Sequence, residues 1–297
     1  EPKVKMKILI TGAQGQVGKE LVSIANQRGF DVIAAGQTEL DITQLKNIES
    51  YVEVHQPDLV INAAAYTAVN KAEEEQDITY AINRDGTANL AAVSKEKNIP
   101  LLHISTDYVF DGTKSEAYSE NDAVSPLGIY GISKWQGEET IRQTLPEHII
   151  LRVAWVFGAQ GNNFVKTMLR LAKDRDELSV VADQFGRPSP AKDIAKTLII
   201  LAEQYQKEKT LEWGTYHYCG DEKVSWCGFA KEILKQAKEQ GLIEKDIKVN
   251  AITTAEYQDP TKRPANSMLD CEKIKNTFGI EMPSWKESLN QVLTELK

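Results

Sequence analysis

A tyrosine and a lysine stand four residues apart in the stretch Tyr130-Gly131-Ile132-Ser133-Lys134. If this stretch is helical, both side chains project from one face of the helix, one turn apart. A phenol with its ordinary pKa of about 10 exchanges protons poorly at neutral pH, and a neighbouring ammonium favours the phenolate. The pair therefore has the residue types that acid/base chemistry requires.

The same spacing also arises by chance on amphipathic helices, where the lysine is merely solvated. Tyr205 and Lys209 repeat it at the polar end of a predicted helix, with no hydroxyl-bearing strand before them. Tyr130, in contrast, follows a predicted strand that ends at Thr106. A hydroxyl that polarises a carbonyl, a tyrosine that protonates the resulting alkoxide and a lysine that tunes the tyrosine form a complete set for hydride transfer.

The element that would hold a hydride carrier lies near the beginning of the chain. An apolar run over 7–10 predicts a strand, and a helical pattern begins at about residue 20. Between them, Gly12, Gly15 and Gly18 are spaced three residues apart. Glycines let the backbone turn sharply and approach a pyrophosphate, whose charge rests on the helix N-terminus. A plain tight turn is the alternative, but a strand before it and a helix after it favour dinucleotide binding.

Further strands are predicted over 30–35, 58–65 and 100–107, with helices over 45–54 and 81–95 between them. This alternation predicts an α/β protein with a Rossmann-like, doubly wound parallel sheet. The residues after the second strand, 36–38, include no acidic residue for a ribose 2′-hydroxyl and no arginine for a 2′-phosphate. The sequence therefore does not separate NADH from NADPH.

Composition and charge restrict the classes of partner. The 297 residues can bury a full core, and a net charge of -8 disfavours nucleic acid or an anionic membrane as the main partner. Three cysteines without CxxC spacing suit a reducing compartment. The sequence contains neither a long apolar run nor a secretory leader pattern. We therefore expect a cytoplasmic protein.

Four longer motifs point to a particular family, and they lie at 62–73, 105–112, 161–164 and 263–267. Together with the glycine turn and the Tyr130/Lys134 pair, they make the chain resemble the dTDP-4-dehydrorhamnose reductases, within the extended short-chain dehydrogenase/reductase family. The resemblance covers nearly the whole chain. It implies an oxidoreductase that uses NADPH or NADH to reduce the 4-keto group of dTDP-4-dehydro-L-rhamnose to dTDP-L-rhamnose, for polysaccharide biosynthesis.

The resemblance also implies roles for individual residues. Thr106 would orient the carbonyl, Tyr130 would donate the proton, and Lys134 would hold the nicotinamide ribose and lower the pKa of Tyr130. Further cofactor positions would be Gly12, Gly15, Gln16, Val17, Gly18, Asp41, Ile42, Ala63, Ala64, Ala65, Tyr66 and Asn83. The dTDP-sugar would contact Thr106, Asp107, Tyr108, Trp155, Asn163 and Arg263. From the pattern alone, Asp41 suits the N-cap region of a helix equally well, and Trp155 suits a core position.

The expected nicotinamide-binding domain spans residues 6–157, and a smaller mixed α/β substrate lobe spans 158–297. The chain is expected to rejoin the sheet over about 190–220, so the lobe is discontinuous. Some members of the family bind magnesium through glutamates at a dimer contact. Glu20 and Glu295 match two such positions, but Lys192 stands where a third carboxylate would be. We therefore expect no metal, and a homodimer is compatible with the resemblance.

Three other functions fit parts of the sequence. Related dehydratases carry Thr-Asp-Glu, whereas here Tyr108 follows Asp107, so elimination lacks its second acid/base. The regulatory subunit of methionine adenosyltransferase resembles the same reductases, but a regulator needs no intact set of Thr106, Tyr130 and Lys134. A reductase of another 4-keto nucleotide sugar is the third alternative.

Overall fold

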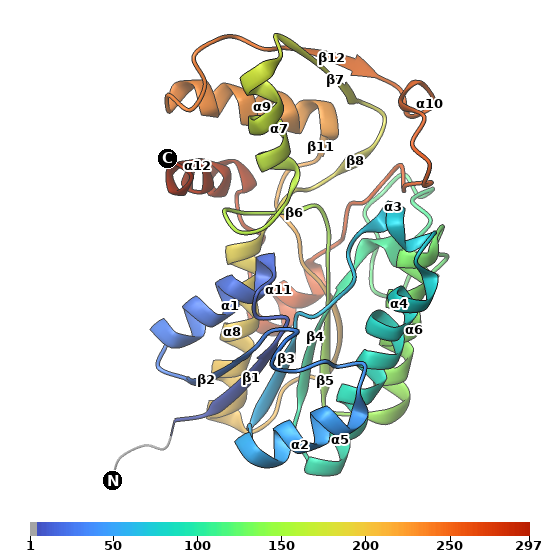
Figure 1. Ribbon diagram of the computed structural model, residues 1–297, viewed down its shortest axis with the longest axis vertical. Helices are drawn as coiled ribbons and strands as arrows, with labels where there is room; N and C mark the ends of the chain where they lie inside the picture. The colour runs from blue at the N-terminus through green and yellow to red at the C-terminus, as the bar shows by residue number, and fades with distance from the viewer. Residues whose placement is uncertain (1–4) are drawn as a thin grey trace.

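A six-stranded parallel sheet forms the centre of the computed structural model, which describes residues 5–297 (Figure 1). The strand order is β10-β5-β4-β3-β1-β2, and every neighbouring pair is parallel. The strands are β1 (Lys7–Thr11), β2 (Asp31–Ala35), β3 (Leu59–Asn62), β4 (Leu101–Thr106), β5 (His148–Val153) and β10 (Gly214–His217). The Rossmann-like fold class expected from the sequence is confirmed.

Helices cover both faces of this sheet (Figure 1). One layer contains α1 (Gln16–Gln27) and α8 (Ala191–Glu208), and the other contains α2 (Leu45–His55), α5 (Thr87–Lys97) and α6 (Ile129–Thr144). Successive side chains of β1 therefore enter two different cores: Ile8 and Ile10 pack in one, and Leu9 packs in the other. All three are fully buried, which explains why the strand is a continuous apolar run.

The connection between β3 and β4 differs from the single helix predicted over 81–95. It consists of α3 (Val69–Ala72), α4 (Gln76–Tyr80), a π-helical turn (Ala81–Gly86) and α5. The side chain of Asn83, inside the π turn, bonds both backbone groups of Tyr66. A Cβ on Gly137 of α6 would lie only 2.1 Å from the Asn83 carbonyl oxygen, so α6 packs directly on this turn. A π-helical turn of this kind does not change the hydrophobic periodicity of the sequence, so the sequence did not indicate it.

A second part of the molecule lies beyond the carboxyl ends of the sheet strands (Figure 1). It contains α7 (Phe164–Asp174), α9 (Trp226–Glu239) and α12 (Trp285–Glu295), with the parallel pair β7 (Glu177–Val181) and β12 (Lys248–Ile252). Its separate core includes the buried side chains of Phe229, Ile233 and Trp285. The smaller elements are β6 (Val156–Phe157), β8 (Phe185–Gly186), β9 (Ser189–Pro190), β11 (Val224–Ser225), α10 (Thr254–Tyr257), α11 (Glu272–Phe278) and a 3-10 turn (Asp107–Val109).

The chain crosses between the two parts more than once. After β5 it forms β6, α7 and β7 in the second part, and it then returns through α8 to β10 in the sheet. No helix in the part of the chain that the structure describes is both long and apolar enough to cross a membrane.

Candidate active site

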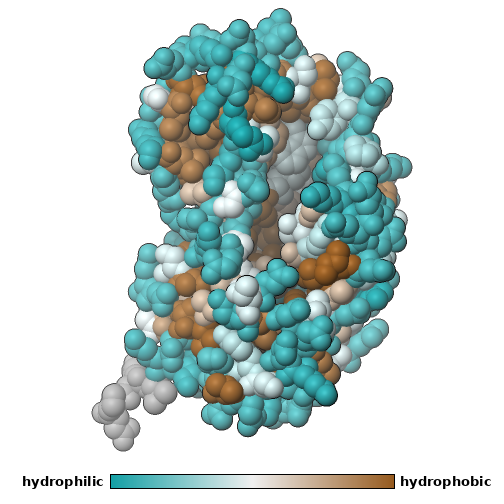
Figure 2. All heavy atoms as spheres, viewed as in Figure 1, coloured by the Kyte–Doolittle hydropathy of each residue, from teal (hydrophilic) through white to brown (hydrophobic). Residues whose placement is uncertain are grey.

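A cleft of about 560 Å³ lies at the carboxyl ends of the sheet strands. Figure 2 shows a hollow on this face, between the sheet and the second part of the molecule. The cleft is lined by eleven of the residues assigned from the sequence: Gly15, Gln16, Val17, Ala63, Ala65, Thr106, Asp107, Tyr108, Tyr130, Lys134 and Trp155. The structure therefore brings together the glycine turn and the three residues assigned to hydride transfer.

Sequence reasoning assigned no role to several residues that line the same cleft. They are Gln14, Thr67, Val69, Ile104, Ser105, Val153, Ala154, Val156, Gly161 and Asn162. Most are small or apolar residues next to an assigned one. Ile104, Ser105 and Val153 lie at the carboxyl ends of β4 and β5, and this position is the signal that could have identified them, because ligands bind at this edge of parallel sheets.

Helix α6 places Tyr130 and Lys134 on one face, as the sequence predicted. Gly131 lies between them, and a Cβ there would be 2.2 Å from the carbonyl oxygen of Tyr108. The helix can therefore approach the 3-10 turn closely, and the rings of Tyr108 and Tyr130 meet edge to face with centroids 5.3 Å apart. The buried ammonium of Lys134 donates to the carbonyl oxygen of Ile104 at 2.8 Å.

Thr106 ends β4 and holds its hydroxyl beside the phenol of Tyr130. Its Oγ1 accepts from the backbone N–H of Tyr108 at 3.1 Å and donates to Asp107 Oδ1 at 3.2 Å. The hydroxyl thus caps the 3-10 turn and is held at the strand end, where it faces the cleft.

Burial dominates the ionisation of the pair in this structure. Burial raises the pKa of Tyr130, and the nearby Asp107 and Tyr108 raise it further against the opposing hydrogen bond of Thr106. Burial also lowers the pKa of Lys134 to about 8. In this structure the phenol is therefore protonated at neutral pH, which is the form that a proton donor needs.

The glycine turn has the geometry of a pyrophosphate site. Gly12 has φ 62°, and a Cβ there would lie 2.5 Å from backbone atoms of Ala63. A Cβ on Gly18 would lie 1.9 Å from the Gly12 carbonyl oxygen. A Cβ on Gly15, in contrast, would contact only that oxygen, at 3.4 Å, so space remains beside Gly15 for a ligand. Helix α1 starts there without a side-chain cap, which leaves its first N–H groups free for phosphate oxygens.

These residues fit a nicotinamide dinucleotide, but several positions assigned to it lie outside the cleft lining. Asp41 accepts from the backbone N–H and hydroxyl of Thr43 in a local turn, and the N-cap of α2 is Gln44. Ile42 is buried against Gly86. The other positions outside the lining are Gly12, Gly18, Ala64, Tyr66 and Asn83, and contact between any of these and the cofactor stays a prediction.

Trp155 also lines the cleft. Its backbone has φ 50°, which a bulky residue rarely adopts. Its ring stacks on Trp226 with centroids 3.6 Å apart, and Gly186 supplies the space because a Cβ there would lie 2.6 Å from the ring. The indole therefore belongs to the second part of the molecule and to the cleft at the same time.

The side chain of Asn163 connects α7 to the glycine turn. Its side-chain amide donates to Gln16 Oε1 at 3.0 Å and to the Gly158 carbonyl at 2.8 Å, and its Oδ1 accepts from Lys166. These bonds cap α7 and fasten it to the glycine turn. Asn163 is outside the cleft lining, and its contact with the dTDP-sugar stays a prediction.

Arg263 reaches the site through Tyr108. Its guanidinium donates to the Tyr108 hydroxyl at 2.9 Å, to Asp259 at 2.6 Å and to Asn70 at 3.0 Å. Arg263 also lines a neighbouring hollow of about 620 Å³ together with Lys223, Lys262 and Phe185. A basic hollow therefore adjoins the cleft that contains Tyr130.

The carboxylates matched to a magnesium site do not fit a divalent cation. Lys192 forms an ion pair with Glu295, and its charge also acts on Glu20, opposing the rise in pKa that burial causes there. The ammonium of Lys192 therefore already supplies the positive charge beside these carboxylates. Within residues 5–297, no group of three or more His, Cys, Asp or Glu side chains has the arrangement of a metal site.

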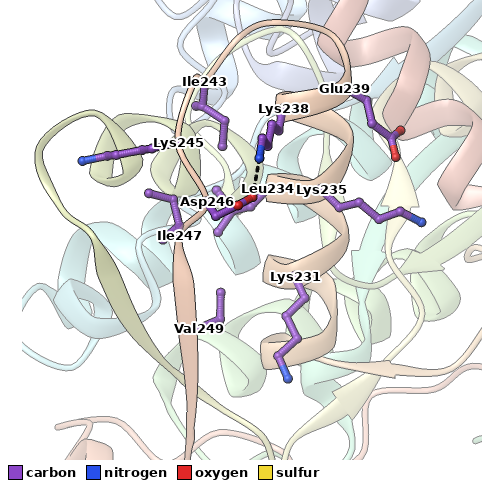
Figure 3. Close-up of a pocket in the computed structure, with 10 residues that line it drawn as sticks. All are labelled: Lys231, Leu234, Lys235, Lys238, Glu239, Ile243, Lys245, Asp246, Ile247 and Val249. Atoms are coloured by element: carbon purple, nitrogen blue, oxygen red, sulfur yellow. Dashed lines mark hydrogen bonds and ion pairs between the residues drawn. The ribbon is translucent and has the colours of Figure 1, made fainter.

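A groove of about 630 Å³ on the second part is separate from this site (Figure 3). It lies between α9 and the segment that leads into β12, and none of its residues lines the cleft. Lysines surround an apolar floor, but Lys238 is paired with Asp246 at 2.6 Å and Lys245 with Asp176 at 2.8 Å. Much of the charge in this groove is therefore already neutralised.

The parallel sheet, the glycine turn and the cleft with Thr106, Tyr130 and Lys134 define an oxidoreductase of the short-chain dehydrogenase/reductase type. Comparison with known proteins gives the particular family. A family model described as the RmlD substrate binding domain matches residues 6–297, and the chain belongs to the dTDP-4-dehydrorhamnose reductases.

Relatives match over nearly their full length. The chain is 47% identical to a dTDP-4-dehydrorhamnose reductase of Aggregatibacter actinomycetemcomitans, over 96% of this chain and 98% of the relative. It is 39% identical to the reductase of Sinorhizobium fredii, over 98% of each. A crystal structure of the Bacillus anthracis reductase in complex with NADP has a TM-score of 0.90 at 36% identity, over 98% of this chain and 100% of that one. A Clostridium acetobutylicum reductase also has a TM-score of 0.90, at 40% identity, over 98% and 99%.

Proposed function

We propose that this protein reduces the 4-keto group of dTDP-4-dehydro-L-rhamnose to give dTDP-L-rhamnose. The observation that carries the proposal is that one cleft contains Thr106, Tyr130 and Lys134 together with the glycine turn and Trp155. The names of relatives up to 47% identical support the sugar. The cleft itself supports the reaction type, because its residues suit proton donation to a carbonyl oxygen.

When it is bound, the nicotinamide supplies the hydride to the carbonyl carbon. The hydroxyl of Thr106 orients the carbonyl oxygen, and the phenol of Tyr130 gives that oxygen its proton as negative charge develops. Lys134 lies one turn along α6 and is assigned to the nicotinamide ribose. Its bond to Ile104 fixes the ammonium at the floor of the cleft.

The basic hollow next to the cleft is assigned to the nucleotide diphosphate. Lys223, Lys262 and Arg263 line it, and a guanidinium offers paired donors to phosphate oxygens. Arg263 also donates to the Tyr108 hydroxyl, so a diphosphate bound there would lie next to the sugar site. Trp155 then packs on the sugar from the opposite side.

Elimination is disfavoured by the position of Tyr108. Its hydroxyl accepts from Arg263, and burial raises its pKa, so it is not a base at neutral pH. A purely regulatory role is disfavoured because the three residues of the reducing set lie together in a cleft that would have no use in a regulator.

The experiment is to follow oxidation of NADPH and of NADH with dTDP-4-dehydrorhamnose. Matched assays use UDP- and GDP-linked 4-keto sugars. We expect turnover with the dTDP-sugar, and the NADP bound to the Bacillus anthracis relative supports NADPH as the better cofactor. Faster turnover of a UDP- or GDP-linked sugar would reassign the substrate. Absence of oxidation with all of them would favour the regulatory alternative.

We also propose a cytoplasmic location and a homodimer. The three cysteines are buried thiols, which suits a reducing compartment. Fractionation of cells and the mass of the protein in solution test these two proposals separately.

A further inference from the structure

A carboxylate lies at the carboxyl end of β2, beside the glycine turn. The chain turns back after this strand, because the backbone N–H groups of Glu39 and Leu40 both donate to the carbonyl oxygen of Gly36. A Cβ on Gly36 would lie 2.9 Å from Oε2 of Glu39 and 3.0 Å from Cγ of Gln14. The turn therefore returns the side chain of Glu39 to the end of the strand, close to Gln14, which lines the cleft.

The carboxyl end of β2 is the place where a dinucleotide-binding sheet meets the adenosine ribose. In such sheets an acidic residue about 20 positions after the glycine turn accepts from the ribose 2′-hydroxyl, whereas a nearby arginine accommodates a 2′-phosphate. Glu39 follows Gly18 by about that separation. Residues 36–38, directly after β2, contain neither kind of side chain. The fold therefore supplies the charged group of this position from one residue further along the chain.

The carboxyl group of Glu39 is ionised at neutral pH. The backbone N–H of Glu39 lowers its pKa most, followed by the hydroxyl of Thr38, which donates to Oε2 at 3.0 Å. The backbone N–H of Gly36 lowers the pKa further. Among residues 5–297, no lysine or arginine is one of the groups that shift this pKa. A second anion at the same place would meet an uncompensated negative charge and donors that are already occupied.

We propose that Glu39 distinguishes NADH from NADPH, an inference that rests on the cofactor site of the proposed function. Its carboxylate accepts a hydrogen bond from the ribose 2′-hydroxyl of NADH, and it repels the 2′-phosphate of NADPH because like charges then lie close together. The side chain thus reduces any advantage that NADPH gains from the rest of the site. Glu39 acts on the ribose of the adenosine, so it sets cofactor selectivity and takes no part in the reduction itself.

The test is the Kd of each cofactor, measured by fluorescence titration without any sugar. Glu39→Gln keeps the length and shape of the side chain and removes its charge. We expect the Kd of NADPH divided by the Kd of NADH to fall about 10-fold, chiefly because NADPH binds more tightly. The fall should be smaller at 1 M salt, where the screening length is only about 3 Å. Glu39→Lys, which places a cation at this position, should lower the ratio further.

A matched control is Asp31→Asn. Asp31 is exposed, as Glu39 is, but it lies at the amino end of β2, away from the glycine turn. Its variant removes the same charge from the protein, so the ratio of the two Kd values should stay that of the unaltered protein. An equal fall of the ratio in Asp31→Asn would overturn the assignment to Glu39, because net charge alone would then explain it.

A second pair of ligands isolates the ribose position from the rest of the cofactor. Adenosine 2′,5′-bisphosphate and 5′-AMP differ only in the 2′-phosphate, and Glu39→Gln should tighten binding of the first without tightening binding of the second. If Glu39 only holds its own turn in place, the variant should weaken both ligands alike. That result, or an unchanged ratio, would overturn the proposal. Absence of turnover with every sugar would overturn the proposed function, while the expected shift in these Kd values would still support the role of Glu39.

Discussion

The carboxylate of Glu138 and the guanidinium of Arg152 form an ion pair inside the protein, 2.7 Å apart, with side chains 0% and 2% exposed. Glu138 lies on α6, one turn after Lys134, and Arg152 lies on β5. Ser105 on β4 also donates to Glu138 at 2.5 Å. The pair therefore fastens the helix that contains Tyr130 and Lys134 to the two strands beneath it.

Removing the charge of Glu138 should destabilise the whole protein. In Glu138→Gln the Arg152 guanidinium stays buried without a counter-ion, which typically costs about 3–5 kcal/mol in the free energy of unfolding. Urea unfolding measures this directly. The control is Glu139→Gln on the same helix: Glu139 pairs with Arg142 and is 38% exposed, so its loss should cost less than about 1 kcal/mol. Equal losses in the two variants would contradict the structural importance of the buried pair.

Tyr130→Phe should keep the fold and cofactor binding but lose turnover. Because the phenol is the assigned proton donor, kcat should fall by about 10²-fold or more, measured as NADPH oxidation. Tyr205→Phe is the matched control, since Tyr205 and Lys209 have the same spacing but line a hollow away from the cleft. A Tyr130→Phe enzyme with nearly normal turnover would refute the assigned role.

Alanine substitutions in the glycine turn should have two different effects, one on stability and one on NADPH binding. In Gly18→Ala the added Cβ would lie 1.9 Å from the Gly12 carbonyl oxygen, so the melting temperature should fall. In Gly15→Ala the nearest atom is at 3.4 Å, so the melting temperature should hold while the Kd of NADPH rises, because the methyl group enters the space beside α1. Calorimetry and fluorescence titration of NADPH measure the two effects. Unchanged NADPH binding by Gly15→Ala would place the pyrophosphate elsewhere.

The stability of the protein should depend on pH through Asp107. Its folded pKa of about 7 exceeds the ordinary 3.8, so its contribution to stability is fully present below the unfolded pKa and is lost as pH rises toward 7. Above pH 7 the full penalty of burying the charge applies, up to about 4 kcal/mol at 1.36 kcal/mol per pKa unit. Asp107→Asn has no such penalty. Relative to the unaltered protein, the variant should therefore be more stable, with a larger free energy of unfolding, at pH 8 than at pH 4. An equal difference at both pH values would argue against a neutral buried carboxyl group.

Local patterns predicted the parts of the fold and site that depend on neighbours in the sequence. The glycine turn after β1, the helix that pairs Tyr130 with Lys134 and the strand that ends at Thr106 were all predicted, because each has a short signal of spacing or hydrophobicity. The parallel sheet followed from the alternation of these elements. The residue roles themselves stay predictions.

Long-range contacts could not be predicted from the same patterns. Nothing near Glu138 in the sequence indicates its pairing with Arg152 on β5, a strand that the sequence analysis did not name. Asn163 belongs to a family motif, and only the fold reveals that its amide faces Gln16. In the same way, the expected effect of Lys134 on Tyr130 depends on where the ammonium points, and the carbonyl of Ile104 binds it.

Because the chain returns to the sheet late, the central sheet cannot be completed during synthesis until β10 has been made. β10 pairs with β5 at the edge of the sheet, yet it follows β6, α7, β7 and α8 in the chain. A nascent chain that has just released β5 from the ribosome therefore exposes an unpaired strand edge, which favours aggregation, until Gly214–His217 emerges. A fragment that ends after β5 would retain the glycine turn and α6. It would also retain the unpaired edge of β5, which favours aggregation.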